Sequence, residues 1–391
     1  MAVNRRAVQR LLGGHPWIYR SDIVQLPAEN PPLVDVTDER GRSYGAALYS
    51  SSSQIALRML SMPFSPRLDL PALVARRLRE AAAYRERIVH DSNAFRVAFS
   101  EADLLPGLVV DRFNDLVTFQ VLTQAMDGEA VRRAVVETLA DLYSPASIIE
   151  RVEERIRELE ALPPRASQVV WSADEDTPRT STEFEMNGLR FGFEALAGQK
   201  TGTFLDQREN HAAAERYGRG RALDVCTYQG GFALHLNRVC AQVTGVDISR
   251  EALEVAEANQ QRNGGREIEW IEANAFDLLK EYAVRGERYE TIVLDPPAFA
   301  KNKAAVEGAL RGYKEMNLRA LKMLEPGGVL VTCSCSFHVG ESEFLEMLNS
   351  AAQDAHRHLR ILETRAQSQD HPVLLGMPES HYLKCVIASV R

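Results

Sequence analysis

The second half of the chain contains short apolar runs that alternate with longer amphipathic segments. The apolar runs are typical of buried strands and occupy 222–225, 243–247, 268–271, 291–294 and 329–335. The amphipathic segments are typical of helices and occupy 232–237, 250–263 and 306–324. Two further strands are predicted at 359–364 and 382–390. The alternation predicts a doubly wound α/β sheet, in which ligands bind at the carboxyl ends of the strands.

The first half of the chain has a different pattern. Short strands with turn signals, at 33–36 and 44–49, predict a small β-rich domain. A segment at 70–90 that is rich in Ala, Arg and Glu predicts a linker helix. Strands at 95–99, 108–111 and 116–121 and an amphipathic helix at 128–143 then predict a central α/β domain. We therefore predict three domains, at 1–68, 69–175 and 176–391.

Three local features refine this division. Asn187-Gly188 between two alternating runs predicts a hairpin over 183–194 at the start of the third domain. Residues 150–168 are rich in Arg and Glu and predict a charged surface helix. Glu101 and Asp103 are expected to lie in a solvated turn.

Composition limits the classes of protein to consider. The 391 residues are 45% hydrophobic and 26% charged, which is typical of a globular protein of two or three domains. No apolar run approaches the roughly 18 residues that a membrane span needs, and the N-terminal residues do not resemble a signal peptide. We expect a cytoplasmic protein without membrane contact.

The cysteines and the charge add two expectations. Five cysteines without a CxxC pair favour reduced thiols over a disulfide framework or a zinc site, so no metal is expected. The net charge of −8 means that any contact with RNA depends on a local basic patch. Arg5, Arg6, Arg10 and Arg20 provide such a patch, because no acid lies among the first 20 residues. The alternative is a solvated basic helix face.

The segment 221–247 carries the first candidate chemistry. A strand ends at Asp224, a turn of Thr227 to Gly231 leads into a helix, and the next strand ends at Asp247. An acid at the second strand end can accept hydrogen bonds from ribose hydroxyls. Asp224 stands where a dinucleotide site needs glycine, and its carboxylate would repel a pyrophosphate. The pattern therefore favours a ligand with an ammonium group, such as S-adenosylmethionine, although an ordinary βαβ unit remains the alternative.

Two later strand ends carry the second set of candidate catalytic residues. Asp295-Pro296-Pro297 forms a stiff turn that can hold an acid against a planar nitrogen-containing base, and it leaves the target atom open. Cys333 and Cys335 are two apart in a strand and therefore face the same side. A thiol at this strand end is placed for nucleophilic attack on C6 of cytosine, which makes C5 reactive towards a methyl donor. The alternative is that both are buried as small hydrophobic residues.

These motifs resemble those of the class I S-adenosylmethionine-dependent methyltransferases that carry a PUA domain and make 5-methylcytosine in large-subunit (23S) ribosomal RNA. The resemblance covers nearly the whole chain and rests on GHPWIYRSDI, SEADLLPGLVVDRF, GQKTGTFLDQREN, LDVCTYQGGFALHL, ANAFDLL, LDPPAFAK, TCSCSFH and the tail from DHPV to HYLK. It implies a Rossmann-like catalytic domain preceded by a small β-barrel PUA-like domain and a central α/β domain.

The resemblance also implies roles for residues. Cys335 matches the family's nucleophile in its Ser-Cys-Ser context, and Asp295 is expected to pair with the cytosine. Cys333 stays open as a competing thiol. The expected cofactor site consists of Phe204, Arg208, Asp224, Thr227, Tyr228, Gly230, Asp247, Ile248, Asn274, Ala275, Asp295 and Pro296. The expected RNA contacts are Arg5, Arg6, Arg10 and Trp17.

Two other functions remain as alternatives. The same fold and the Asp-Pro-Pro turn would suit a methyltransferase for exocyclic amino groups, which needs no thiol. A non-catalytic RNA-binding assembly factor would retain the fold without the reaction. A nicotinamide enzyme is disfavoured by the missing glycine pattern. The sequence leaves open the modified cytosine, the base that removes its C5 proton, and whether the protein is a homodimer.

Overall fold

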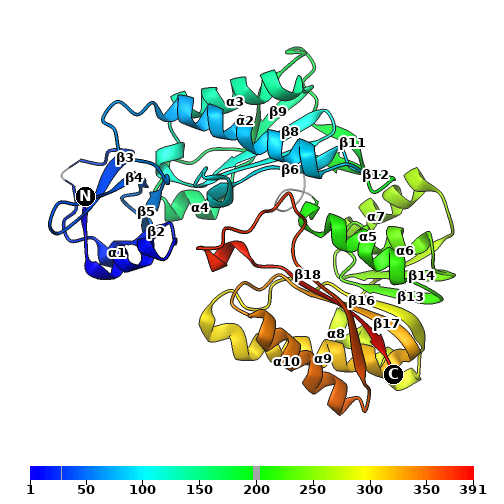
Figure 1. Ribbon diagram of the computed structural model, residues 1–391. Helices are drawn as coiled ribbons and strands as arrows, with labels where there is room; N and C mark the ends of the chain where they lie inside the picture. The colour runs from blue at the N-terminus through cyan, green and yellow to red at the C-terminus, as the bar shows by residue number, and fades with distance from the viewer. Residues whose placement is uncertain (28, 197–202) are drawn as a thin grey trace. The chain divides into compact units, whose positions relative to one another are not determined.

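The computed structural model describes residues 1–27, 29–196 and 203–391, and its chain forms two compact units (Figure 1). Unit 1 contains residues 1–185, 193–205 and 369–380, and unit 2 contains 186–192, 206–368 and 381–391.

Unit 1 begins with a small five-stranded sheet in the order β1-β3-β4-β5-β2. Its elements are β1 (Ala2–Val3), α1 (Arg5–Leu12), β2 (Trp17–Tyr19), β3 (Leu33–Asp38), β4 (Ser43–Tyr49) and β5 (Ile55–Met59). A bridge between Val3 and Ile23 brings the chain that follows β2 back to β1, as in a small barrel. Its core includes Ile18, Val36 and Leu57. The predicted β-rich N-terminal region is confirmed.

The second sheet of unit 1 has the order β10-β9-β8-β7-β6. Its strands are β6 (Ala94–Phe99), β7 (Leu108–Phe113), β8 (Leu116–Val121), β9 (Ser147–Glu150) and β10 (Gln168–Ser172). Helices α2 (Leu70–Ile88) and α3 (Glu129–Tyr143) lie side by side against it (Figure 1). Asp69 caps α2 by accepting a hydrogen bond from the Ala72 N–H at 3.0 Å, so the predicted linker helix begins where expected. This helix and α3 together bury a continuous hydrophobic core with the sheet.

Two sequence predictions in this unit were wrong. The charged segment 150–168 forms only a short helix, α4 (Glu154–Leu159). Its Arg157 is buried and donates hydrogen bonds to the Pro163 carbonyl and to Asp127, so the segment folds inward around that side chain. Glu101 is not solvated either. It is buried and accepts a 2.7 Å hydrogen bond from the Trp17 indole N–H.

A segment from near the C-terminus, residues 369–380, belongs to unit 1. Arg85 is fully buried and donates to the Asp370 carbonyl at 2.7 Å and to the Asp103 carboxylate at 2.8 Å. The Asp370 carboxylate in turn accepts from the Arg96 N–H at 2.9 Å. These contacts join positions that are distant in sequence into one polar core.

The predicted hairpin is confirmed as β11 (Ser181–Met186) and β12 (Leu189–Glu194). Asn187 and Gly188 lie between these strands with φ of 53° and 74°. Both angles are positive, as a type I′ hairpin turn requires.

Unit 2 contains a seven-stranded sheet in the order β15-β14-β13-β16-β17-β19-β18. Its strands are β13 (Arg221–Val225), β14 (Gln242–Asp247), β15 (Ile268–Glu272), β16 (Tyr289–Leu294), β17 (Leu324–Ser334), β18 (Leu359–Arg365) and β19 (Lys384–Val390). The first five are parallel, and β19 runs antiparallel to both β17 and β18. The alternating pattern of the sequence thus predicted the sheet correctly.

Helices cover both faces of this sheet (Figure 1). They are α5 (Arg208–Tyr217), α6 (Gly231–Asn237), α7 (Arg250–Asn263), α8 (Ala275–Arg285), α9 (Val306–Met323) and α10 (Glu341–Asp354). Helices α5 to α7 lie on one face and α8 to α10 on the other. Short 3-10 turns elsewhere in the chain are η1 (Arg20–Asp22), η2 (Ser100–Asp103), η3 (Gln124–Met126), η4 (Leu205–Gln207), η5 (Lys303–Ala305) and η6 (Pro378–Ser380).

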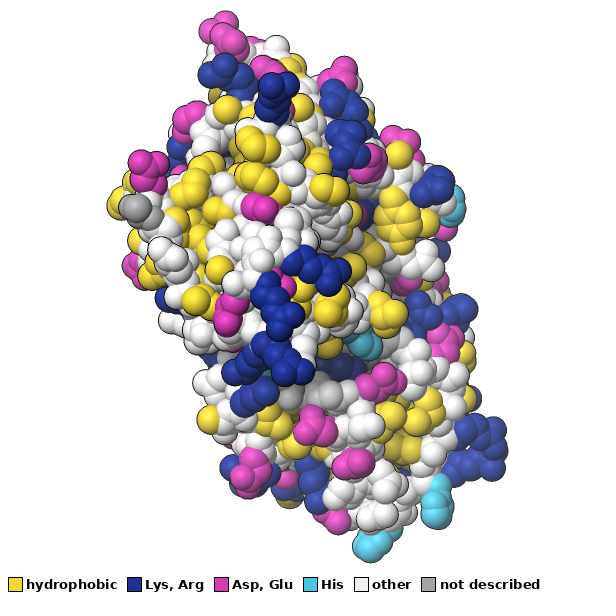
Figure 2. All heavy atoms as spheres, turned by 60° about the vertical axis from the view of Figure 1, so that its left-hand side comes forward, with side chains coloured by type: hydrophobic (Ala, Val, Ile, Leu, Met, Phe, Trp, Pro, Cys, Tyr) yellow, Lys and Arg dark blue, Asp and Glu magenta, His cyan; other side chains and the backbone are white. Residues whose placement is uncertain are grey.

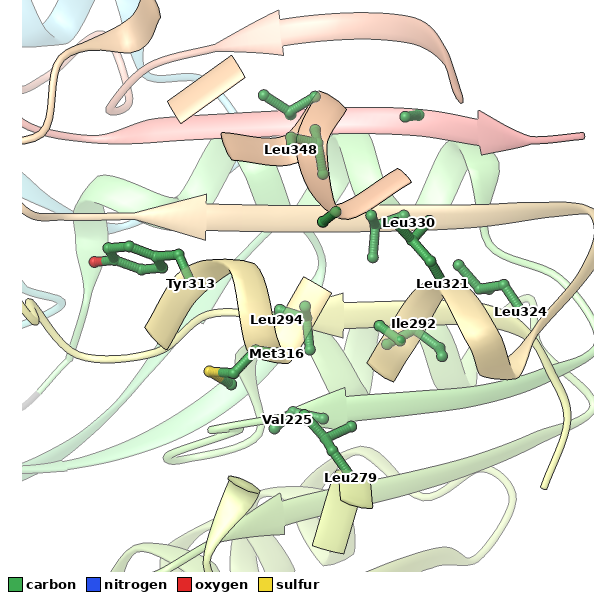
Figure 3. Close-up of a cluster of buried hydrophobic side chains, with 14 of the residues drawn as sticks. Val225, Leu279, Ile292, Leu294, Tyr313, Met316, Leu321, Leu324, Leu330 and Leu348 are labelled. Carbon is green, nitrogen blue, oxygen red and sulfur yellow. The ribbon is translucent and has the colours of Figure 1, made fainter. Parts of the chain in front are cut away.

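The core of unit 2 lies between the sheet and helices α8 to α10 (Figure 3). Val225, Leu294 and Leu330 from the strands pack with Leu321 from α9. Each such fully buried side chain contributes about 1.5–3 kcal/mol relative to exposure. Tyr313 lies at the edge of the cluster, and its hydroxyl points towards the carboxyl ends of β16 and β17 (Figure 3). The core therefore supports one end of the sheet, where the candidate site lies.

Candidate active site

Five residues predicted from strand ends lie along one edge of the sheet of unit 2. Asp224 is the last residue but one of β13, Asp247 ends β14, and Asn274 follows β15 by two residues. Asp295 comes directly after β16, and Cys335 comes directly after β17. These two strands are adjacent and parallel. The register therefore brings all five to the carboxyl end of the parallel strands, as expected.

The Asp224 carboxylate stabilises the glycine turn that follows β13. One carboxylate oxygen accepts hydrogen bonds from the Thr227 hydroxyl at 2.5 Å and from the Ala233 N–H at 2.9 Å. The other, Oδ1, is buried and has no hydrogen-bond partner among the described residues. Burial raises the pKa of this carboxyl to about 7. The Asp224 side chain is fully buried, and its hydrogen bonds go to Thr227 in the turn and to Ala233 in α6.

The turn has an unusual backbone. Cys226 and Tyr228 have positive φ angles of 64° and 51°, which is uncommon for residues other than glycine. Gly230 also has a positive φ, 83°, and precedes the first turn of α6. A Cβ on Gly231 would lie only 2.5 Å from the His211 ring. Both glycines are therefore required by local geometry and packing.

Asp247 anchors the neighbouring strand end. Its two oxygens accept hydrogen bonds from the Tyr228 N–H at 2.9 Å and the Ser249 N–H at 3.0 Å. Ile248, directly after it, is 68% exposed although it is apolar. This strand end thus offers a carboxylate beside an uncovered apolar surface.

The end of β15 offers a similar surface. Asn274 caps α8 through its Oδ1, which accepts from the Phe276 N–H at 2.9 Å. The Phe276 side chain is 39% exposed, and its ring lies 5.9 Å from that of Phe299. Ala275 begins the helix and packs partly against the core. Sequence analysis identified Asn274 and Ala275 but missed Phe276, whose exposure only the structure shows.

Asp295 lies in a group of acids. Burial, with Asp206 and Asp224 nearby, raises its pKa to about 8, and a hydrogen bond from the Gln207 side chain acts in the opposite direction. Asp206 accepts a 2.5 Å hydrogen bond from the Tyr382 hydroxyl, whereas its Oδ1 is buried without a partner among the described residues. At neutral pH, Asp295 therefore retains a proton and can donate it. Pro296 follows as a buried residue that stiffens this turn.

The two candidate cysteines have different environments. Cys333 is fully buried within β17 and lies opposite Cys385 of β19 in the register. Burial raises the pKa of the Cys333 thiol well above its usual value, and the Cys385 thiol acts in the same direction. Cys335 is partly exposed just beyond the strand. Of these two thiols, Cys335 is therefore the one that a substrate can reach in the described arrangement.

Sequence analysis assigned no role to three side chains around Cys335. The Tyr313 hydroxyl lies 2.9 Å from the Ser336 hydroxyl, directly after the cysteine. Lys384 of β19 donates to the Ser336 carbonyl at 2.7 Å. Tyr313 lies in none of the quoted motifs, and Lys384 ends the HYLK of the tail without an assigned role, so the fold is what shows that both lie near Cys335.

The polar segment 198–210 is described only in part, because residues 197–202 lie outside the described residues. In unit 1, Phe204 exposes 43% of its surface. In unit 2, Arg208 is buried at the start of α5 and pairs with Glu209 at 3.4 Å. That the segment lies across the cofactor stays a prediction.

The predicted RNA contacts of unit 1 separate into two kinds. Arg5 and Arg6 are exposed on α1. Arg10 pairs with Asp22 at 2.9 Å and lies over the Tyr19 ring, and Trp17 donates its indole N–H to Glu101. Arg10 and Trp17 therefore already make structural contacts. Figure 2 shows Lys and Arg side chains on the surface of the molecule, although the net charge is negative.

Comparison with known families defines the class. Residues 1–62 match a PUA-like domain, and residues 105–374 match the S-adenosylmethionine-dependent methyltransferases. The second match covers most of the chain and includes the strand ends from Asp224 to Cys335. The protein is therefore an S-adenosylmethionine-dependent methyltransferase with an N-terminal PUA-like domain, as the resemblance implied.

Individual relatives narrow this class. The chain is 37% identical to the ribosomal RNA large subunit methyltransferase I of Tolumonas auensis over 96% of both chains. It is 34% identical to the protein of the same name from Escherichia coli, over 96% of this chain and 95% of that one. The chain belongs to the ribosomal RNA large subunit methyltransferase I family.

Solved structures show the same fold. A putative S-adenosylmethionine-dependent methyltransferase from Streptococcus mutans superposes with a TM-score of 0.83 at 17% identity, covering 100% of this chain and 99% of that one. A putative methyltransferase complexed with SAH gives 0.82 at 17% identity and the same coverage. In the described part of the chain, no helix has the length and apolarity of a membrane span, and no three His, Cys, Asp or Glu side chains gather as metal ligands.

Proposed function

We propose that this protein methylates carbon 5 of a cytosine in large-subunit ribosomal RNA. The observation that carries the proposal is a partly exposed thiol, Cys335, and a proton-retaining acid, Asp295, directly beyond two adjacent parallel strands. Addition to C6 of cytosine needs a nucleophile and an acid at the ring nitrogen. The relatives' name supports ribosomal RNA as the substrate.

The residues at this sheet edge fit S-adenosylmethionine. Asp247 can accept hydrogen bonds from ribose hydroxyls, since each of its oxygens has a second lone pair beyond the one that accepts from the backbone. The exposed apolar side chains of Ile248 and Phe276 suit the faces of an adenine ring. Asp224, Thr227, Tyr228 and Gly230 shape the turn beside it. The bound cofactor supplies an electrophilic methyl group.

The chain's own groups carry the remaining chemistry. The Cys335 thiolate attacks C6, and a sulfur–carbon bond forms while the ring electrons shift towards N3. Asp295 donates its proton to N3, which turns C5 into a nucleophilic enamine carbon that takes the methyl group. Loss of the C5 proton to a base then expels the Cys335 thiolate, N3 loses its added proton, and Asp295 regains it. Once the base has released the C5 proton to solvent, the enzyme is back in its starting state.

Binding of RNA is assigned to unit 1. Arg5 and Arg6 are the exposed members of the N-terminal arginine group and can contact phosphates. We assign the same role to the PUA-like region within 1–68 and place the central domain at 69–175 and the catalytic domain at 176–391. A ribosomal substrate implies a cytoplasmic location.

A second function remains as the competitor. The rigid Asp295-Pro296-Pro297 turn would also hold an exocyclic amino group for methylation, and that reaction needs no thiol. The partly exposed Cys335 favours the first function, because a thiol at this position has no task in amino-group transfer.

A covalent trap separates the two functions. RNA that contains 5-fluorocytosine should form an adduct with the wild-type protein, since the fluorine at C5 cannot leave as a proton does. The Cys335→Ala variant should bind S-adenosylmethionine normally but lose the adduct and turnover, whereas Cys333→Ala should retain both. An adduct lost only in Cys333→Ala would reassign the nucleophile. Full activity in both variants would favour amino-group methylation.

A further inference from the structure

Lys384 is a buried lysine beneath the segment that carries Cys335. It is the first residue of β19 and lies opposite Ser334 of β17 in the antiparallel register. Its ammonium donates hydrogen bonds to the carbonyls of Ser336 at 2.7 Å and Tyr382 at 2.8 Å. The lysine therefore contacts the chain at Ser334 and Ser336, on both sides of Cys335.

The partners of this ammonium are neutral. Within the described part of the chain, both of its hydrogen bonds go to backbone carbonyls, and Lys384 forms no ion pair with a carboxylate. Burying a charge without a counter-ion is unfavourable. Burial lowers the pKa of Lys384 to about 8, and a negative charge on Cys335 opposes that shift. A thiolate at Cys335 would supply the missing counter-charge.

We infer that Lys384 is a positioning residue for the nucleophile: it holds the backbone on either side of Cys335 and stabilises the thiolate form of that cysteine. The inference rests on the proposed function in taking Cys335 as the nucleophile. It goes beyond it by naming what activates the thiol, since a cysteine reacts as the thiolate and needs a nearby positive charge to form it at neutral pH.

The other groups around this point do not supply that charge. The groups around it are Tyr313 from α9, Asp295 after β16, Asp206 and Gln207 before α5, Cys333 and Cys385 on the strands, and Glu341 and Glu343 at the start of α10. Asp295 retains its proton at neutral pH and so does not oppose the thiolate. The two glutamates act on Lys384 and favour its charged form.

The first test measures the thiol of the wild-type protein without RNA. Alkylation of Cys335 by iodoacetamide, followed by mass spectrometry of its peptide, gives the thiol's titration midpoint between about pH 5 and about pH 10. The inference expects a midpoint clearly below the ordinary value of about 8.5. A midpoint at or above that value would overturn the inference without any variant.

Three variants then test whether the Lys384 ammonium is the positive charge that stabilises the Cys335 thiolate. Lys384→Met should raise the midpoint by about one pH unit or more, because the thiolate loses a cationic neighbour. Lys384→Arg should stay closer to the wild type, since it preserves the charge. The control Lys314→Met, on α9, removes a surface ion pair with Asp354 of α10 and should leave the midpoint unchanged. An unchanged midpoint in a folded Lys384→Met protein would contradict the inference.

Methyl transfer provides a separate readout. The kcat of Lys384→Met should fall at neutral pH and partly recover at alkaline pH, where the thiolate forms unaided, whereas a purely structural defect would not recover. Binding of S-adenosylmethionine should stay unchanged. If the thiol titration behaves as expected but no 5-methylcytosine forms, the proposed function fails while the role of Lys384 stands.

Discussion

The two units bury charged side chains in opposite ways. In unit 1, buried acids are paired: Asp111 with Arg96, Glu150 with Arg132, and Glu160 with Arg58. In unit 2, Asp224 and Asp206 each keep a buried oxygen without a partner among the described residues, and burial raises the pKa of Asp224 and Asp295. Removing one member of a buried ion pair leaves an uncompensated charge and destabilises the fold, whereas buried acids with raised pKa values cluster at functional sites. The pairing of a charge therefore indicates function better than its burial.

Removing Asp295, the acid with a raised pKa at the reaction centre, should have the largest effect. Asp295→Asn should lower kcat by about 100- to 10,000-fold, since the ring nitrogen loses its acid. Stability should not fall. Burial raises the pKa of Asp295 in the folded protein to about 8, so the carboxyl releases its proton when the protein unfolds at neutral pH. The free energy of unfolding therefore falls as pH rises from about 4 to about 8. Asn does not titrate, so the variant should lack this pH-dependent destabilisation. Single-turnover assays measure activity, and thermal unfolding at about pH 4 and about pH 8 measures stability. A variant that stays active but is destabilised would contradict the contrast between the two units.

Removing a paired acid should have the reverse effect. Asp111→Asn leaves the Arg96 guanidinium without its 2.8 Å partner and should lower the free energy of unfolding by about 3–5 kcal/mol. Activity per folded molecule should stay the same. The control Arg76→Gln breaks an exposed pair with Glu80 and should cost less than about 1 kcal/mol. Urea unfolding measures both, and a similar loss in the two variants would refute the distinction.

A smaller effect is expected at the cofactor's ribose. Asp247→Ala should weaken binding of S-adenosylmethionine about tenfold, because each hydrogen bond that it removes contributes about 0.5–1.5 kcal/mol. The matched control is Glu272→Ala, which removes the exposed acid opposite Asp247 in the register. Calorimetry should show normal affinity for the control alone. Unchanged affinity in Asp247→Ala would remove this residue from the site.

The smallest effect concerns the arginines of α1. Replacing Arg5 and Arg6 with Gln should lower the salt dependence of RNA binding by about one unit of slope for each phosphate that the protein no longer binds. Arg10→Gln should instead reduce stability and leave the slope unchanged, because Arg10 is paired with Asp22. Filter binding across salt concentrations distinguishes them. Equal slopes in all variants would mean that α1 does not bind RNA.

The fold of unit 2 could be predicted because its signal is local. Each strand is a short apolar run, and parallel strands place their following residues at one edge, so Asp247 and Cys335 could be assigned to that edge before the structure was known. The hairpin at Asn187-Gly188 was predictable for the same reason, since the turn depends on two adjacent residues.

Long-range pairing could not be predicted in this way. Glu101 was expected in solvent, and its partner Trp17 lies 84 positions away in the sequence. Lys384 lies 48 positions from Ser336, in a strand whose pattern shows only that it is buried. Sequence patterns report burial well, but the partner of a buried charge depends on how distant segments pack.

The polar core around Arg85 has a consequence for how the protein forms during synthesis. Arg85 donates to the Asp370 carbonyl, 285 positions further along the chain. A ribosome adds about 5–20 residues each second, so roughly 15 to 60 seconds separate the emergence of the two partners. During that interval the Arg85 guanidinium has the Asp103 carboxylate but lacks the Asp370 carbonyl. Unit 1 should therefore remain accessible to proteases and chaperones on the ribosome until residues 369–380 have been made.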